Sequence, residues 1–290
     1  MIGIEDMSYP QRQRLQFIES VALWEGIVRR QHVSSAFDVS ENHITRDFSL
    51  YRKSFPGNLD YDISARAYRP GKGFKPHIGS GSSKEYLALL RAGLETSFSA
   101  VLPGIGRGET SAACLPSPDA PLNDKMLREV TRALHQGHGV KIKYQSLRSP
   151  EPVERIIWPH ALVFAGVRWH IRAYDSKWEH FADFTLHRIM SATFVPGASP
   201  ALAEDDVDWR ETINIDIRLA DKLTETQKAV LVKEYGMKLI GKKWIWRVPI
   251  KRCLASYFLR WLRLDLSEVN SYPIALVDPE LAKKFLFDDV

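Results

Sequence analysis

Residues 140–189, VKIKYQSLRSPEPVERIIWPHALVFAGVRWHIRAYDSKWEHFADFTLHRI, decide the fold of the central part of the chain. Short runs of alternating apolar and polar residues are separated by turns that contain Pro or Gly, a pattern typical of closely spaced β-strands. In the strand from residue 167 to 174, the side-chain period of two separates two faces. The expected core face is Val167, Trp169, Ile171 and Ala173, and the opposite, donor-rich face is Arg168, His170, Arg172 and Tyr174. The pattern predicts a small β-barrel.

The composition is that of a soluble protein of two or three domains, with 290 residues, 44% hydrophobic and 26% charged. A net charge of +5 favours polyanionic partners. Cys114 and Cys253 have neither disulfide-framework nor metal-ligand spacing, so we expect no cofactor and no metal site. No apolar run approaches the roughly 20 residues that span a bilayer. The sequence therefore predicts a cytoplasmic protein without a membrane partner.

The amino-terminal third predicts a helix-turn-helix. A helix over residues 11–24 ends at Gly26, a short one covers 30–37, and a third begins at Glu41 with Ser40 as its cap. The third helix has one apolar face, formed by Ile44, Phe48, Tyr51 and Phe55. Its opposite side carries amide and guanidinium groups, which can pair with adenine and guanine in a major groove. The residues expected to contact DNA are Asn42, His43, Thr45, Arg46, Ser49 and Lys53. A solvated helix face is the alternative.

A basic hairpin follows this helix. Residues 59–68 alternate like two strands, and residues 63–84 contain no acid. Such a hairpin is typical of the wing of a winged helix, which lies against phosphates or in a minor groove. The expected contacts are Arg66, Arg69 and Lys72. The wing favours DNA binding over a solvated face.

The remaining segments indicate a multidomain α+β protein. A linker helix from residue 83 and a Gly-, Pro- and Ser-rich connector over 103–121 precede an amphipathic helix over 122–136. After the barrel, strands over 213–219 and 244–250, a helix with the capping box Thr224–Gln227 and a helix over 252–264 indicate a small α+β domain. We expect a winged helix-turn-helix domain at 1–80, a linker at 81–121, the barrel at 122–197 and a C-terminal domain at 205–290.

Three central motifs resemble a WYL domain: Pro159-His160, residues 169–174 and residues 183–189, with the name triplet standing here as Trp169-His170-Ile171. The resemblance implies an Sm-like or SH3-like barrel that senses a ligand in a bacterial transcription regulator, followed by a C-terminal extension that helps form a dimer. The stretch Tyr61–Pro70 also resembles the wing of WYL regulators associated with anti-phage defence islands such as BREX and CBASS.

The resemblance also implies a set of ligand-binding positions, which carry guanidiniums, imidazoles, hydroxyls and aromatic rings. They are Tyr144, Ser146, His160, Trp169, His170, Arg172, Phe184 and Arg188. Such groups can hold a phosphate by charge-assisted hydrogen bonds and a base by stacking, so the expected ligand is a nucleotide or a short single strand. We expect neither Arg172 nor Arg188 in the core. Solvated arginines and structural histidines are the alternative.

Two other classes of function stay open. A metal-dependent enzyme could use His160, His170 and His187 with Asp183 or Asp175, although no metal-ligand spacing supports this. An architectural nucleic-acid-binding protein would need the same wing and helix but no ligand. The preferred hypothesis is a homodimeric, sequence-specific repressor that binds an inverted-repeat operator, senses a nucleotide and controls a phage-defence operon.

Overall fold

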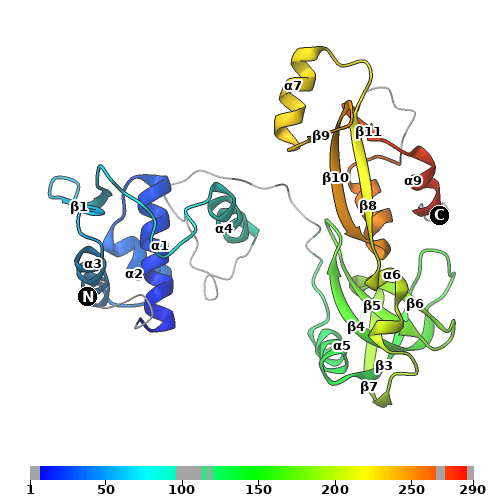
Figure 1. Cartoon of the computed structure of the whole chain (residues 1–290). Coiled ribbons are helices and arrows are strands. Elements are labelled where there is room, and N and C mark those ends of the chain that lie inside the picture. The colour runs from blue at the N-terminus through cyan, green and yellow to red at the C-terminus, as the bar shows by residue number, and fades with distance from the viewer. Residues whose placement is uncertain are drawn as a thin grey trace. The chain divides into compact units, whose positions relative to one another are not determined.

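The computed structural model describes residues 7–95, 113, 115, 118, 120–265 and 272–285. The chain forms two compact units, residues 1–116 and 117–290 (Figure 1). The expected glycine-rich hinge at residues 104–108 lies outside the described residues. Within the described ranges, no helix is both long and apolar enough to cross a membrane.

The first unit contains a winged helix, as predicted. Helices α1 (Tyr9–Glu25), α2 (Arg30–Phe37) and α3 (Glu41–Ser54) precede the hairpin of β1 (Leu59–Asp62) and β2 (Ala67–Pro70), and α4 (Ser83–Glu95) follows. Gly26 ends α1 with a φ of 73°, a conformation that favours glycine. The Ser40 hydroxyl accepts the His43 N–H and starts α3. A bridge from Val28 to Tyr68 adds a third strand segment beside the hairpin. The core packs Leu15 and Ile18 of α1 against Phe48 of α3.

A buried carboxylate ties the chain after the wing to this core. Glu19 of α1 is 1% exposed and accepts backbone N–H groups of His77, Ile78 and Gly79, at 2.6, 2.9 and 2.9 Å. It also accepts the Tyr51 hydroxyl at 2.7 Å. Four donors compensate the cost of burying the charge, so the carboxylate fixes the path of residues 77–79.

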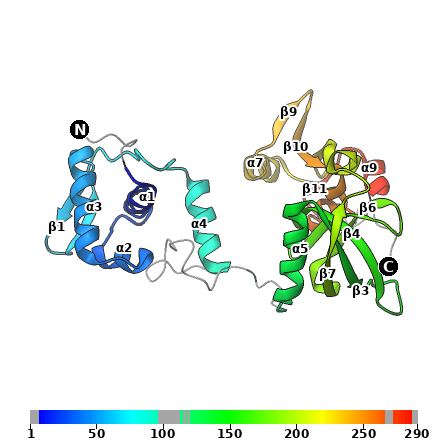
Figure 2. The same cartoon turned by 90° about the horizontal axis from the view of Figure 1, so that it is seen from below.

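The second unit begins with α5 (Asp124–Gln136) and a five-stranded antiparallel sheet. The strands are β3 (His138–Tyr144), β4 (Val153–Phe164), β5 (Trp169–Asp175), β6 (His180–Thr185) and β7 (Ile189–Ala198), in the order β6-β5-β4-β3-β7. The 3-10 turn η2 (Leu186–Arg188) joins β6 to β7. Helix α5 packs Met126, Val130 and Ala133 onto the sheet, and Figure 2 shows it running along β3 and β7.

The sheet is not the closed barrel expected from the sequence. Closure would require β6 and β7 to exchange backbone hydrogen bonds, and among the described strands β6 pairs with β5 alone and β7 with β3 alone. Strand β6 has only six residues. After η2, the chain resumes beside Tyr144 of β3, which pairs with Ile189. The chain therefore passes directly from one open edge of the sheet to the other.

The expected division of the faces of β5 is also partly wrong. Ile171 and Ala173 are in the core as predicted, but Trp169 is 44% and Val167 is 51% exposed. On the opposite face, His170 and Arg172 are 7% and 6% exposed instead of solvated. The reason is that residues from beyond the sheet cover this face, so β5 is buried on both sides in its middle.

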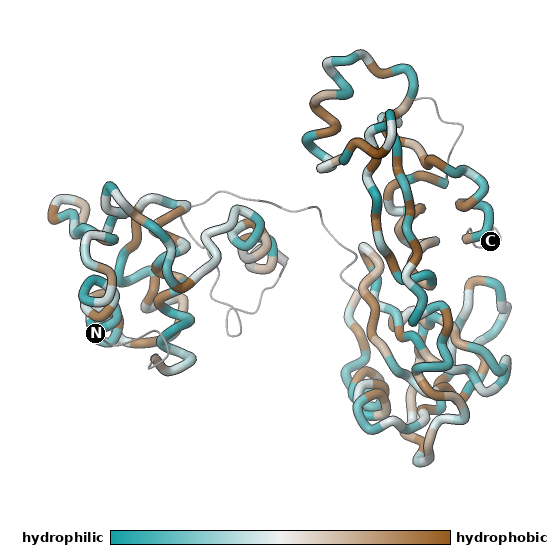
Figure 3. The backbone as a smooth tube through the Cα atoms, viewed as in Figure 1, coloured by the Kyte–Doolittle hydropathy of each residue, from teal (hydrophilic) through white to brown (hydrophobic). Residues whose placement is uncertain are grey.

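The C-terminal part of this unit is a second, four-stranded antiparallel sheet. Its elements are η3 (Ala203–Asp205), α6 (Val207–Arg210), β8 (Thr212–Leu219), α7 (Glu225–Glu234), β9 (Lys238–Ile240), β10 (Lys243–Lys251), η4 (Arg252–Leu254), α8 (Ala255–Trp261), β11 (Ile274–Leu276) and α9 (Pro279–Phe285). The strand order is β11-β8-β10-β9. The Thr224–Gln227 capping box is present as predicted. Figure 3 shows apolar and hydrophilic residues alternating along β8 and β10.

The helix expected over residues 252–264 is shorter. The 3-10 turn η4 precedes α8, which ends at Trp261, and Arg263 has a φ of 54°. Such a backbone conformation does not continue a right-handed helix. Phe258 and Trp246 pack on the core of this sheet, whereas Trp244 and Trp261 are 42% and 69% exposed.

Candidate nucleic-acid interface and ligand site

The polar face of α3 is exposed. Asn42, Arg46, Ser49 and Lys53 follow one side of the helix, at spacings of four, three and four residues, and all are exposed. The opposite side, with Ile44, Phe48 and Tyr51, is fully buried. Thr45 and Ser49 donate their hydroxyl hydrogens to helix carbonyls, Glu41 O and Thr45 O, both at 2.8 Å. The exposed face therefore presents one amide and two cationic side chains to solvent, while the opposite face of the helix is packed in the core.

A buried ion pair fixes the orientation of this helix. Asp47 of α3 accepts from Arg14 Nε of α1 at 2.6 Å, and both side chains are almost completely buried. Arg14 Nη2 also lies 2.9 Å from His43 Nε2. His43, one of the expected DNA contacts, thus has an intramolecular partner. Sequence reasoning missed the pair because Arg14 and Asp47 lie 33 residues apart and each reads locally as an exposed helix position.

The wing carries the expected basic residues. Arg66 lies in the exposed turn of the hairpin with a φ of 50°, and Lys72 is exposed just after β2. Arg69 Nε donates to Asp62 at 2.8 Å. The Ala65 N–H, and then Arg69, lower the pKa of the Asp62 carboxyl. Because this ion pair is solvent-exposed, it holds Arg69 only weakly and a phosphate can compete for it.

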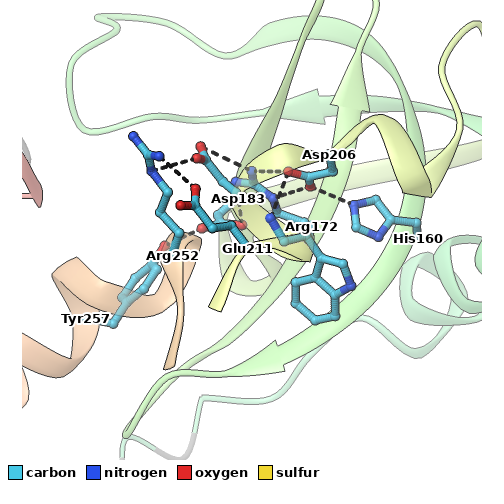
Figure 4. Close-up of polar contacts among 9 residues, drawn as sticks. His160, Arg172, Asp183, Asp206, Glu211, Arg252 and Tyr257 are labelled. Atoms are coloured by element: carbon cyan, nitrogen blue, oxygen red, sulfur yellow. Dashed lines mark hydrogen bonds and ion pairs between the residues drawn. The ribbon is translucent and has the colours of Figure 1, made fainter. Parts of the chain in front are cut away.

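The second candidate site surrounds Arg172 of β5. Its guanidinium binds Asp206 through two parallel bonds, Nε to Oδ2 at 2.7 Å and Nη2 to Oδ1 at 2.8 Å. His160 Nε2 of β4 lies 3.0 Å from the same carboxylate, and Figure 4 shows Asp206 between His160 and Arg172. Asp206 is 1% exposed and also caps α6 by accepting the Trp209 N–H. The expected anion-binding arginine is therefore already paired with an internal anion.

Burial and the Arg172 charge shift the pKa values of the titratable groups in this site. Burial opposes the ionisation of Asp206, but the Arg172 guanidinium outweighs it and lowers the pKa of the carboxyl. Burial lowers the pKa of His160, although Asp206 acts in the opposite direction. Asp183 of β6 lies 3.3 Å from Arg172 Nη1 and accepts the Tyr257 hydroxyl at 3.1 Å, and burial raises the pKa of its carboxyl. Arg172 therefore forms ion pairs with both Asp183 and Asp206.

Of the three aromatic positions in the predicted set, two lie in the core. Tyr144 and Phe184 are 8% and 3% exposed, with their rings edge to face at 5.1 Å, and the Tyr144 hydroxyl accepts the Thr185 N–H. Both belong to the hydrophobic core of the sheet. Trp169 contacts Phe164, with ring centroids 5.1 Å apart, at the opposite end of β5 from Asp175. The rings of Tyr144 and Phe184 therefore support the sheet and offer a ligand little surface, whereas Trp169 is 44% exposed.

The polar residues of the predicted ligand set also lie in different environments. Ser146 lies in the loop after β3 and accepts the N–H groups of Arg148 and Ser149. Arg188 is half-buried in η2, where its carbonyl accepts the Gln145 N–H. Burial, followed by the charges of Arg188 and Arg168, lowers the pKa of His170 to about 4. His170 is therefore neutral near pH 7.

The three histidines of the metal-site alternative have separate partners. His160 lies beside Asp206, His170 Nδ1 is 3.4 Å from Thr185 Oγ1, and His187 Nε2 is 2.8 Å from Ala120 O. Within the residues that the structure describes, no three His, Cys, Asp or Glu side chains lie close enough together to hold a metal ion.

Sequence reasoning missed two residues of this site, Asp206 and Tyr257. Asp206 and Tyr257 reach Arg172 and Asp183 from 34 and 74 residues along the chain. The only local signal was Asp206 ahead of a short helix, which predicts a cap but not a partner for Arg172.

Three family models match the chain in order: the BrxR transcriptional regulator winged helix-turn-helix domain over residues 10–92, the WYL domain over 125–194, and the BrxR C-terminal dimerization domain over 212–281. The chain is also 31% identical to the DNA-binding transcriptional repressor CapW of Pseudomonas aeruginosa, covering 93% of this chain and 89% of the relative. The chain belongs to this family of BrxR- and CapW-type transcriptional regulators.

The chain is also similar to a second CapW protein and, more weakly, to a solved structure. CapW of Escherichia coli strain KTE188 is 30% identical, over 94% of this chain and 90% of the relative. Among solved structures, the proteasome accessory factor PafBC of Arthrobacter aurescens is similar, at 15% identity and a TM-score of 0.30, over 95% of this chain and 46% of that one. The resemblance to WYL regulators is confirmed, and this BrxR-type regulator has a DNA-binding winged helix and a dimerization domain.

Proposed function

We propose that the protein is a homodimeric repressor that binds an inverted-repeat operator through α3 and the wing. The observation that carries the proposal is the exposed face of Asn42, Arg46, Ser49 and Lys53 on a helix whose other side is buried. Asn and Arg are the residue types that make bidentate contacts to adenine and guanine. A family dimerization domain over residues 212–281 supports two-fold symmetry, which an inverted repeat matches.

The WYL part is proposed to sense a nucleotide or a nucleic-acid fragment. Cationic and aromatic side chains gather around β5 and β6, and the charge of Arg188 reaches His170. A ligand that binds one arrangement of the dimer better than another shifts operator affinity, because only differential affinity moves such an equilibrium. Control of a phage-defence operon is proposed from the wing resemblance at Tyr61–Pro70.

The test measures the affinity of the full-length protein for its selected operator, with and without individual ribonucleoside monophosphates and short single strands. A regulatory ligand is expected to change operator affinity by about 5- to 150-fold, the range of typical coupling energies. Tight operator binding that no nucleotide or strand alters would favour a ligand-independent repressor. Equal affinity for all DNA sequences would favour the architectural alternative.

A further inference from the structure

A polar cavity of about 630 Å³ lies between the sheet of the WYL part and the C-terminal elements of the same unit. Its walls come from β5, β6, α6, η4, α8, α9 and the loop after β3, and we call it the junction cavity. Its size lies within the roughly 300–1,000 Å³ of small-molecule sites. Of the positions predicted from the sequence to bind ligand, it shares only Arg172.

More basic than acidic side chains line the junction cavity. Four basic side chains line it, against two acidic ones. The basic ones are Arg148, Arg172, Arg252 and Lys284, and the acidic ones are Asp183 and Asp208. Such a lining favours an anionic ligand.

The arginines differ in how firmly they are held. Arg172 is 6% exposed and locked by its two bonds to Asp206. Arg252 lies 3.2 Å from Asp208 and 2.7 Å from Glu211, but its side chain is 45% exposed and theirs are 52% and 43% exposed. Exposed pairs contribute little to stability, whereas a guanidinium binds phosphate oxygens in bidentate geometry. Arg252 is therefore the guanidinium that a phosphate can recruit.

Aromatic rings line the same cavity. Phe181 of β6 and Phe285 of α9 are both partly exposed, and the Arg252 guanidinium lies 5.9 Å from the centre of the Phe285 ring. Rings next to cations are what a planar base attached to a phosphate requires, because the base stacks while the phosphate is neutralised.

We propose that the junction cavity binds a nucleotide, with its phosphate on Arg252 and Lys284 and its base against Phe181 and Phe285. The inference rests on the proposed ligand sensing, and it moves the site from Arg172 and Arg188 to the boundary with the dimerization domain. Across this boundary the Tyr257 hydroxyl already binds Asp183. A nucleotide that contacts both β6 and α9 would form a second link across this boundary. It would therefore stabilise the arrangement in which the two elements face each other.

The test is calorimetric titration of the full-length protein with AMP, GMP, CMP and UMP, each alone, and with adenosine and inorganic phosphate as half-ligands. At least one monophosphate is expected to bind, and both half-ligands should bind at least tenfold more weakly. Arg252→Met and Lys284→Gln should each weaken that monophosphate at least tenfold. The matched control is Arg247→Met, since Arg247 is also a half-exposed arginine paired with an aspartate, Asp216, and lies outside the cavity.

Cys253 lines the cavity and gives an independent readout in a Cys114→Ser background. Burial raises the pKa of its thiol to about 11, so alkylation is followed by mass spectrometry at pH 9 over hours. The bound monophosphate should slow alkylation of the parent but not of Arg252→Met. The inference is overturned if no monophosphate binds, if Arg252→Met and Lys284→Gln both bind like the parent, or if Arg188→Met alone abolishes binding. Operator affinity without nucleotide is measured separately, so loss of DNA binding would count against the proposed function instead.

Discussion

Replacing Arg172 by Ala is expected to destabilise the second unit strongly, although the strand pattern predicted that the fold would tolerate the change. The substitution removes two bonds to Asp206 and one to Asp183, at 2.7, 2.8 and 3.3 Å. Asp206 is 1% exposed and would remain as a buried charge with only His160 and the Trp209 N–H beside it. Removing one member of a buried pair costs about 3–5 kcal/mol in the free energy of unfolding.

The assay is urea unfolding of the full chain, followed by tryptophan fluorescence. Seven of the eight tryptophans lie after residue 117, so the signal reports mainly the second unit, and Trp24→Phe removes the remaining one. Arg188→Ala serves as a half-buried control, with an expected loss below about 1 kcal/mol. The double variant Arg172→Met/Asp206→Leu should recover most of the loss, because apolar residues of similar size often replace a buried pair without cost.

A loss below about 1 kcal/mol for Arg172→Ala would contradict this expectation. Arg172 would then be available for an anionic ligand, as the sequence pattern suggested. A large loss for Arg188→Ala would instead show that the half-buried arginine of η2 supports the sheet.

Three further outcomes follow from the structure. Asn42→Ala or Arg46→Ala should relax the preference for particular base pairs by about 1–3 kcal/mol, measured on single-base operator variants, whereas Arg66→Gln should weaken all sequences equally and reduce the salt slope by about 1. A chain ending after Glu211 keeps Asp206 but lacks the dimerization domain, and it should sediment as a monomer; a dimer would place the interface elsewhere. His170, with a pKa lowered to about 4, is buried neutral. Its stability contribution is complete above pH 6.5 and falls by about 3 kcal/mol toward pH 4, because the unfolded chain binds the proton first; an equally steep loss in His170→Gln would contradict this.

Features set by local sequence were predicted well. Ser40 and the Thr224–Gln227 box cap their helices as expected, and Gly26 ends α1. Each depends on residues within one helical turn, where side-chain hydrogen bonding and allowed φ values decide the outcome. The buried face of α3 follows equally from its period of 3.6 residues.

Features set by distant contacts were not predicted. The period of two showed that Arg172 and Ile171 point to opposite sides of β5, but not that Asp206 and Tyr257 cover the side of Arg172. A buried guanidinium and a solvated one have the same sequence signature until the partner carboxylate is located. The open edges of the sheet could not be predicted for the same reason, because closure depends on whether β6 and β7 come close enough in space to pair. The domain boundaries and the individual DNA- and ligand-binding residues stay predictions.

Reading of an operator by α3 in a two-fold dimer is tested by selecting the genomic fragments that the purified full-length protein binds and footprinting them. We expect one enriched inverted repeat, with half-site centres separated by about 10–10.5 base pairs or a multiple of that spacing. Arg46→Ala should lose the enrichment while retaining weak binding to random DNA. Enriched fragments without a symmetric motif, or the same fragments selected by Arg46→Ala, would contradict it.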